Sequence, residues 1–195
     1  MASSADDRRV RKTKKALREG LAVLLEQKKI KDITVRELAD LTDMNRGTFY
    51  LHYRDIYDLQ EQIENEITAE VTEIFSGIET LREGRGPYSI CIDLLYYIVD
   101  NARMCKVLLS DNGNQTLLNK LSRLLQEQFV HLWIDYFHME DRQAETGYFG
   151  TFLISGFVAM IGKWLDEGMS TPPEWLARQM EALAMHCVGY LQQLH

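Results

Sequence analysis

Proline is scarce in this sequence of 195 residues, which contains 3. Proline ends or kinks a helix because it lacks a backbone N–H and its ring crowds the preceding turn, so its scarcity permits long helices. Runs in which apolar and polar residues alternate with the period of a β-strand are also few. Since 46% of the residues are hydrophobic, the chain can bury a core, and we expect an all-α fold.

Cysteine is equally rare, with three residues at Cys91, Cys105 and Cys187. Their number is odd and they are scattered through apolar helical patterns, which argues against a disulfide framework. They also lack the paired spacing of a metal site. We therefore expect reduced, structural thiols in a cytoplasmic protein.

An uncharged run long enough to cross a bilayer is missing. The longest one, Thr146 to Gly162, has 17 residues, whereas a transmembrane helix needs about 20, so we expect a buried helix there. The charged residues that open the chain have no apolar stretch behind them, and we expect no signal peptide. These features predict a cytoplasmic protein that does not enter a membrane.

Catalytic and metal-binding motifs are missing as well. The sequence has no phosphate-binding glycine loop, no H-E-x-x-H, no nucleophile elbow and no C-x-x-C. His131, Asp135 and His138 lie at i, i+4 and i+7, a spacing that metal ligands can use, but a partly exposed helix often carries such residues too. We expect no enzymatic activity, no metal and no cofactor.

Two short helical patterns follow one another between residues 34 and 53. The first, T-V-R-E-L-A-D at 34–40, places apolar residues at i, i+3 and i+4, and Thr34 and Glu37 are spaced as a capping box. Only Thr42 to Met44 separate this pattern from the second. This is the layout of a helix-turn-helix, whose second helix enters the major groove of DNA.

The second pattern begins at Asn45, a good N-cap residue. At about 100° per residue, Phe49 and Tyr53 share one face, which we assign to the core. The remaining surface mixes glycine with hydroxyl, apolar and basic side chains: Gly47, Thr48, Tyr50, Leu51 and Arg54, with Arg46 and His52 nearer the core boundary. A solvated helix usually carries Lys, Glu and Gln, whereas this mixture suits phosphates and base edges.

Positive charge is concentrated in the same part of the chain. Residues 1–54 hold 13 Lys and Arg against 8 Asp and Glu, a balance of +5, whereas residues 55–195 hold 9 against 21, a balance of −12. The basic run near the N-terminus includes Lys12 and Lys15. Such a run is usually a solvated face, but beside a helix-turn-helix we expect it to contact phosphates.

At these residues the chain resembles the tetracycline-repressor (TetR) family of bacterial regulators. T-V-R-E-L-A-D at 34–40 and N-R-G-T-F-Y-L-H-Y at 45–53 are similar to that family's DNA-binding module. The residues that the resemblance assigns to base edges and the groove are Arg46, Gly47, Thr48 and Leu51, and those that it assigns to phosphates are Thr34, Tyr50 and His52. Many relatives place a phosphate-binding lysine where this chain has Ile56, and we expect Arg54 to replace it.

The remaining patterns predict a second helical domain. Apolar residues sustain a helix from about Asp55 to Leu81, and further helices are expected at about 88–101, 103–110, 114–138, 144–168 and 173–194. We therefore predict a helix-turn-helix domain at residues 1–54 and a helical-bundle regulatory and dimerisation domain at residues 55–195, with about nine helices in all.

The last two predicted helices suit a dimer interface. Apolar residues of the final helix recur at spacings of 4 and 3, a seam for side-by-side packing, and the helix before it is apolar nearly all round. The expected interface residues are Phe152, Gly156, Ala159, Leu176, Met180, Leu183, Cys187 and Tyr190. An intramolecular core is the alternative. A homodimer is favoured because a helix-turn-helix protein usually spans two half-sites, and in the TetR family these two helices form a four-helix interface.

Aromatic side chains are frequent in the predicted C-terminal helices. At helical spacing they usually form ordinary core, but the corresponding part of TetR-family proteins often encloses a cavity for an apolar or aromatic inducer. The ligand contacts expected on that resemblance are Tyr96, Tyr97, Met104, Phe129, Trp133 and Phe152.

These observations together predict a bacterial DNA-binding transcription regulator. We expect a repressor that binds a palindromic double-stranded operator as a homodimer and is released by a small-molecule effector. The alternative is a co-regulator of the same family that responds to a protein partner and not to a small ligand.

Overall fold

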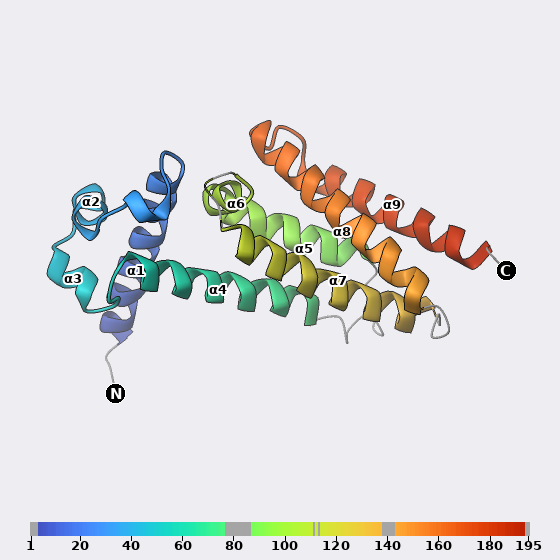
Figure 1. Cartoon of the computed structure of the whole chain (residues 1–195), viewed down its shortest axis with the longest axis horizontal. Coiled ribbons are helices and arrows are strands. Elements are labelled where there is room, and N and C mark those ends of the chain that lie inside the picture. The colour runs from blue at the N-terminus through green and yellow to red at the C-terminus, as the bar shows by residue number, and fades with distance from the viewer. Residues whose placement is uncertain (1–3, 77–86, 111, 113, 138–142, 194–195) are drawn as a thin grey trace. The chain divides into compact units, whose positions relative to one another are not determined.

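The computed structural model describes residues 4–76, 87–110, 112, 114–137 and 143–193, and within these ranges it leaves the side chains of residues 4–7, 76, 129–137, 143–146 and 192 undescribed. The described residues form nine α-helices and one short 3₁₀ helix (Figure 1). The helices are α1 (Ser4–Leu25), α2 (Val35–Leu41), α3 (Arg46–Tyr50), α4 (Ile56–Ser76), α5 (Pro87–Asp100), α6 (Ala102–Leu108), α7 (Gln115–Phe137), α8 (Gln143–Asp166) and α9 (Pro173–Gln193), and the 3₁₀ helix η1 spans Ile30–Asp32. The expected all-α fold of about nine helices is confirmed.

The chain divides into two compact units. The first contains residues 1–67 and 103–115, and the second contains residues 68–102 and 116–195. Helix α4 therefore contributes its first half to one unit and its second half to the other, and α6 belongs to the first unit although it follows α5 in the sequence. This division differs from the sequence-based boundary between residues 54 and 55.

The core of the first unit includes several leucines and a phenylalanine that are completely buried. Helix α1 packs on α2 and α2 packs on α3, and the side chains of Leu17, Leu21, Leu38, Phe49 and Leu59 are completely buried. Each such side chain stabilises the fold by about 1.5–3 kcal/mol relative to an exposed one. The apolar pattern expected for the first half of α4 thus faces this core.

Helix α1 approaches α2 closely at Gly20, which is buried. A Cβ atom at this position would lie 2.5 Å from Cγ2 of Thr42 and 2.9 Å from Cδ1 of Leu38. Contacts this short require a shift of the neighbouring atoms. Glycine at position 20 therefore sets how α1 and α2 pack.

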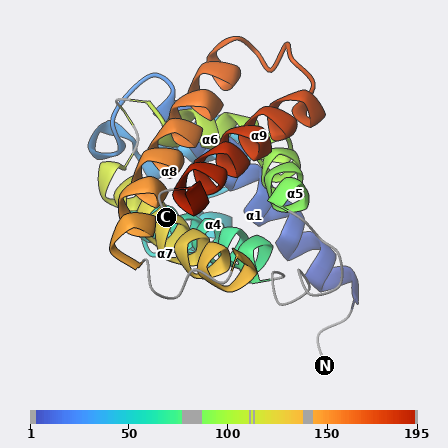
Figure 2. The same cartoon turned by 90° about the vertical axis from the view of Figure 1, so that its right-hand side faces the viewer.

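The second unit is a bundle in which α9 packs between α5 and α8, as Figure 2 shows. Its buried residues include Leu95 of α5 and Met180 of α9. The loop between α8 and α9 is fixed to α8, because the indole N–H of Trp164 donates a hydrogen bond of 2.7 Å to the carbonyl of Thr171.

Helix α8 contains a segment, Gly147–Asp166, that is long enough and apolar enough to cross a membrane by length and composition alone. Its mean hydropathy is 1.3, and 39% of it is buried in the chain. The same composition is typical of a core helix, and one side of α8, including Leu153, Phe157 and Trp164, is indeed buried. The opposite side is exposed to solvent.

Candidate nucleic-acid interface

The first helix of the predicted pair begins as its sequence indicates. Thr34 is the N-cap of α2, and its hydroxyl oxygen accepts a hydrogen bond of 3.2 Å from the backbone N–H of Glu37. The second half of the expected capping box is different, since both carboxylate oxygens of Glu37 lie 2.6 Å from Nζ of Lys28. This ion pair connects the end of α1 to the start of α2.

The turn between α2 and α3 has a left-handed residue. Asp43 has φ 52°, and the backbone N–H groups of Asp43 and Met44 donate to the carbonyls of Asp40 and Ala39 at 3.4 and 2.9 Å. These two hydrogen bonds form a Schellman motif, which ends a helix at a residue of positive φ. The motif places Asn45, the N-cap of α3, directly after the turn.

Helix α3 is short and is fixed at both ends. The Asn45 side chain accepts a hydrogen bond of 2.7 Å from the N–H of Gly47. Phe49 and Tyr53 are buried, as predicted, although Tyr53 lies three residues beyond the end of α3. Burial raises the pKa of Tyr53 to about 12, and the negative charges of Glu66 and Asp58 act in the same direction, so the phenol stays neutral.

The other side of α3 is open to solvent. Leu51 is 80% exposed and Tyr50 is 58% exposed, Arg46 and Gly47 are exposed, and Thr48 and His52 are half-buried. The structure therefore brings all six of these predicted residues onto or beside one short element. Hydroxyl, guanidinium and imidazole donors next to an apolar leucine are groups that can bond phosphates and base edges and contact a thymine methyl group.

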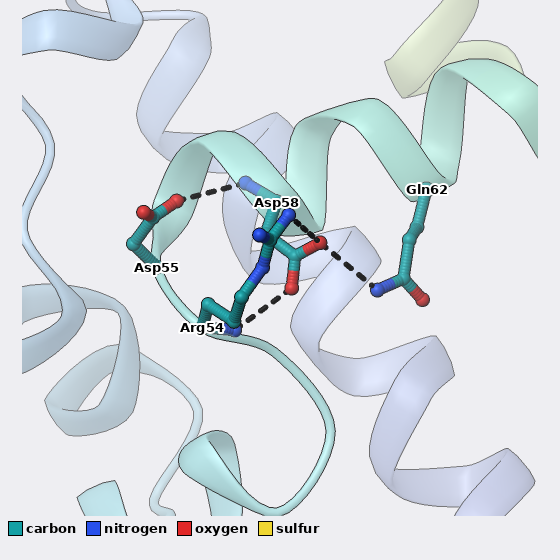
Figure 3. Close-up of polar contacts among 4 residues, drawn as sticks. All are labelled: Arg54, Asp55, Asp58 and Gln62. Atoms are coloured by element: carbon teal, nitrogen blue, oxygen red, sulfur yellow. Dashed lines mark hydrogen bonds and ion pairs between the residues drawn. The ribbon is translucent and has the colours of Figure 1, made fainter.

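Arg54 follows α3 and is part of the cap of α4 (Figure 3). The carboxylate of Asp58 accepts hydrogen bonds from the Arg54 backbone N–H at 2.8 Å and from Nη2 at 3.4 Å, and Asp55 accepts from the N–H of Asp58 at 2.9 Å. The first of these bonds holds the pKa of Asp58 below its usual range. Arg54 keeps a largely exposed guanidinium, whereas Ile56, at the family's lysine position, is buried.

The basic side of α1 belongs to the same unit. Lys12 and Lys15 are exposed, and Nζ of Lys14 lies 6.0 Å from the ring centroid of Tyr53. Within the described residues of α1, burial begins only at Leu17. The first turns of α1 thus present cations to solvent beside the helix-turn-helix.

The six residues expected to contact a ligand do not all belong to one compact unit. Met104 belongs to the first unit, while Tyr96, Tyr97 and Phe152 belong to the second. Tyr96 donates a hydrogen bond to Glu174 and Tyr97 donates one of 2.8 Å to Glu70. Tyr96 and Phe152 are exposed. The side chains of Phe129 and Trp133 lie outside the described residues, as do those of the metal candidates His131, Asp135 and His138.

The expected dimer residues separate into two groups. Leu176 and Met180 are buried by the chain's own helices and face the intramolecular core of the single chain. Phe152, Gly156, Ala159, Leu183 and Tyr190 are exposed, and Cys187 is half-buried. Along part of α9, the apolar residues spaced by 4 and 3 therefore pack against other helices of the same chain.

Sequence reasoning missed several residues that shape this site. The glycine at position 20, inside a helical pattern, could have indicated the close contact between α1 and α2. Ion pairs such as Lys28–Glu37 and Arg18–Glu66, the latter at 3.6 Å, join residues far apart in the chain and leave no local pattern. Within the described residues, no group of three or more His, Cys, Asp or Glu is placed to hold a metal.

Comparison with known proteins agrees with this geometry. A TetR-family sequence model, described as a transcriptional regulator C-terminal region, matches residues 86–186, just over half of the chain. A relative from Bacillus subtilis (strain 168), the uncharacterised HTH-type transcriptional regulator YxbF, is 26% identical over 181 residues. That match covers 89% of this chain but 44% of the relative, so the chain spans less than half of that protein's length.

Solved structures share the fold. A TetR transcriptional regulator from Streptococcus agalactiae 2603V has a TM-score of 0.58 and 20% identity, over 93% of this chain and 97% of the other. The dihydroxyacetone kinase operon activator DhaS has a TM-score of 0.54 and 14% identity, over 91% and 97%. A family model thus matches more than half of this chain, and the helix-turn-helix and C-terminal helices of the chain have the fold of solved regulators. The chain therefore belongs to the TetR family of transcriptional regulators, not to a family of enzymes.

Proposed function

We propose that this regulator binds a palindromic operator in double-stranded DNA with α3 in the major groove. The observation that carries the proposal is the exposed surface of α3, where Leu51 and Tyr50 stand beside Arg46, Gly47 and Thr48. Exposed apolar side chains are costly to hydrate, and a thymine methyl group or a sugar would cover them. A bacterial transcription regulator of this kind acts in the cytoplasm.

Phosphate contacts would come from residues around α3. Thr34 at the start of α2, the half-buried His52, the exposed Arg54 and the cations Lys12 and Lys15 of α1 carry suitable donors. Such contacts position a protein on DNA and make its affinity fall steeply with salt. The acidic balance of residues 55–195 would be repelled by DNA, which favours binding through residues 1–54.

The regulator would act as a homodimer through the exposed sides of α8 and α9. Tyr148, Phe152, Leu183 and Tyr190 are large, apolar or aromatic, and exposed. Among the described residues, no atom other than those of its chain neighbours and its own helix backbone lies within 4 Å of a Cβ atom at Gly156, and a glycine inside a helix costs about 1 kcal/mol relative to alanine. Close approach of a second copy would explain both the exposed aromatic residues and the glycine.

We further propose that the protein is a repressor released by a small apolar or aromatic effector. By linkage, such an effector must bind the DNA-incompetent state more tightly, and a coupling of about 1–3 kcal/mol lowers operator affinity about 5–150-fold. A cavity between α1, α4 and α6 in the first unit measures about 20 Å³, space for about one water molecule. That space is too small for an effector, and we place the effector in the second unit, which contains Tyr96, Tyr97 and Phe152.

The experiment that tests operator binding is selection from a pool of random-sequence duplex DNA, followed by fluorescence anisotropy with the selected duplex and a scrambled control. We expect a two-fold symmetric selected sequence, and affinity that falls about 10³–10⁵-fold between about 50 and 200 mM salt. Equal, weak binding to selected and scrambled DNA would overturn the proposal. It would favour the co-regulator that works through a protein partner.

A further inference from the structure

Arg54 is the last basic residue before a long acidic helix. Helix α4 contains six acidic residues and no lysine or arginine. A helix of this composition repels phosphates, yet its first turn follows shortly after the exposed helix α3 in the chain. The positive charge at this end of α4 therefore comes from Arg54, whose side chain is 82% exposed.

Asp58, in the first turn of α4, binds Arg54 at two points (Figure 3). Oδ2 of Asp58 accepts a hydrogen bond of 2.8 Å from the backbone N–H of Arg54, and Oδ1 lies 3.4 Å from Nη2 of the guanidinium. Nε2 of Gln62 donates a hydrogen bond of 3.3 Å to the same Oδ1. Both oxygens of the carboxylate are thus fixed, and only 13% of the Asp58 side chain is exposed.

An ion pair of this kind either withholds a guanidinium from DNA or holds it in place for DNA, and relative strengths decide between the two. An exposed ion pair contributes little, whereas an arginine–phosphate contact is charge-assisted and frequently bidentate. Asp58 is therefore too weak to withhold Arg54 from a phosphate. A guanidinium also has five N–H donors, and its described contact with Asp58 uses one of them, so Arg54 can bind both groups at once.

We propose that Asp58 is a positioning residue for DNA binding: by binding both the backbone and the guanidinium of Arg54, it directs the remaining donors of that side chain to a phosphate beside the groove that α3 enters. A long side chain loses rotamer freedom when it binds, and one that is already held loses less. The effect on DNA affinity rests on the proposed function. The ordering of Arg54 by Asp58 in the protein without DNA does not.

The first experiment measures the order of the Arg54 side chain by NMR relaxation of its Nε–Hε group, in wild type and Asp58→Asn without DNA. Asparagine keeps an oxygen that can accept from the Arg54 backbone N–H, but it lacks the charge that binds the guanidinium. We expect a lower order parameter in the variant, with a midpoint of thermal unfolding that shows a folded protein. Equal order parameters would overturn the positioning of Arg54, whether or not the protein binds DNA.

The second experiment is a double-mutant cycle of Arg54→Ala and Asp58→Asn, measured by anisotropy with the DNA selected by the wild type. Arg54→Ala should weaken binding about tenfold or more. It should also make the slope of log K against log salt shallower by about 2, since a homodimer loses two phosphate contacts. Asp58→Asn should weaken binding about two- to tenfold and make the slope shallower too, although it removes a negative charge.

The second half of the cycle separates positioning from support of the loop. In the Arg54→Ala protein, Asp58→Asn should not weaken binding further, because the side chain that it positions is absent. Equal weakening by Asp58→Asn with and without Arg54 would mean that Asp58 acts only on the loop, which would overturn the proposal.

Glu61→Gln is the matched control for charge, because Glu61 is an exposed carboxylate three residues further along α4. Its removal should leave the affinity for the selected DNA unchanged or slightly higher, since one repulsive charge is lost. If Asp58→Asn tightens binding in the same way, Asp58 only repels DNA and is not a positioning residue.

Arg54→Lys leaves Asp58 unchanged and so tests the proposal independently of how well Asp58→Asn folds. Lysine keeps the charge but replaces the planar fork by a point charge on a flexible stem. We expect binding about two- to fivefold weaker than that of the wild type, with an unchanged salt slope, whereas wild-type affinity would contradict the proposal. If the wild type selects no DNA while the order of Arg54 depends on Asp58, the proposed function fails and the ordering of Arg54 stands.

Discussion

The molecule exposes apolar side chains on two surfaces whose surroundings differ. On α3, Tyr50 and Leu51 lie among a guanidinium, a glycine and a threonine, on a helix of five residues whose buried side rests on α2. On α8, Tyr148 and Phe152 are 82% and 70% exposed and are followed by small residues along a helix of 24 residues.

This difference indicates different partners. A short helix with mixed donors presents a few points of contact, which suits the edges of base pairs and the phosphates beside them. A long helix with aromatic and small residues presents a continuous apolar strip, which suits another helix. Exposure of an apolar side chain alone would not separate the two cases, whereas the chemistry of its neighbours does.

The largest expected effect comes from removing a donor on α3. Arg46→Ala should weaken binding to the selected operator by about 2–6 kcal/mol, because one base contact of this kind is worth about 1–3 kcal/mol and a homodimer makes it twice. Anisotropy measures the loss and sedimentation velocity measures the oligomeric state, which should not change. An Arg46→Ala protein with wild-type affinity would contradict the placement of α3 in the groove.

Two variants on α9 test whether the exposed apolar surface of α8 and α9 is the dimer interface. Leu183 and Met185 are both exposed but lie about 200° apart around the helix, and Leu183 shares its side with Tyr190. Leu183→Glu should produce monomers and weaken operator binding about 100-fold, because the second half-site no longer binds at high effective concentration. Met185→Glu, the control, should remain dimeric. Equal behaviour of the two variants would refute this choice of interface.

A smaller effect is expected at the close contact between α1 and α2. Gly20→Ala should lower the free energy of unfolding, since the overpacking costs about 1–3 kcal/mol and exceeds the helix propensity gained, about 1 kcal/mol. Thr42→Ser removes the methyl group that is 2.5 Å from the new Cβ and keeps the hydroxyl that donates to Leu38. Urea unfolding of the double variant should therefore show a partial recovery, and a fully stable Gly20→Ala protein would contradict the packing.

Much of the fold and of the α3 surface could be predicted from the sequence, because helical periodicity depends only on residues close together in the chain. The apolar spacing predicted α5 to α9 to within a few residues. The same periodicity assigned Phe49 and Tyr53 to the core and Leu51 to the surface, as the structure confirms. Asn45 as N-cap was also predictable, since its side chain acts on the N–H of a residue only two positions away.

Features that depend on which elements meet were not predictable in this way. The spacing of Leu176 and Met180 has the period of a helix seam, but a period does not distinguish a partner chain from the chain's own core. In the same way, the apolar side of α6 required a neighbour without indicating that α1 and α4 provide it. Contacts such as Arg103–Glu26 join residues far apart in the sequence, and the local sequence around one residue does not indicate which residue is its partner.

The smallest expected effects come from two glycines, one on a packed side of a helix and one on an exposed side. At Gly20 a methyl group meets atoms of Leu38 and Thr42, whereas at Gly156 no atom of the described residues beyond the neighbouring helix backbone lies within 4 Å. Gly156→Ala should therefore stabilise the isolated chain by up to about 1 kcal/mol through helix propensity, the opposite sign to Gly20→Ala. If a second copy packs against α8, the same methyl group should weaken dimerisation, so unfolding at low and high protein concentration should change in opposite directions. Stabilisation at both concentrations would mean that the aromatic strip of α8 pairs elsewhere than at Gly156.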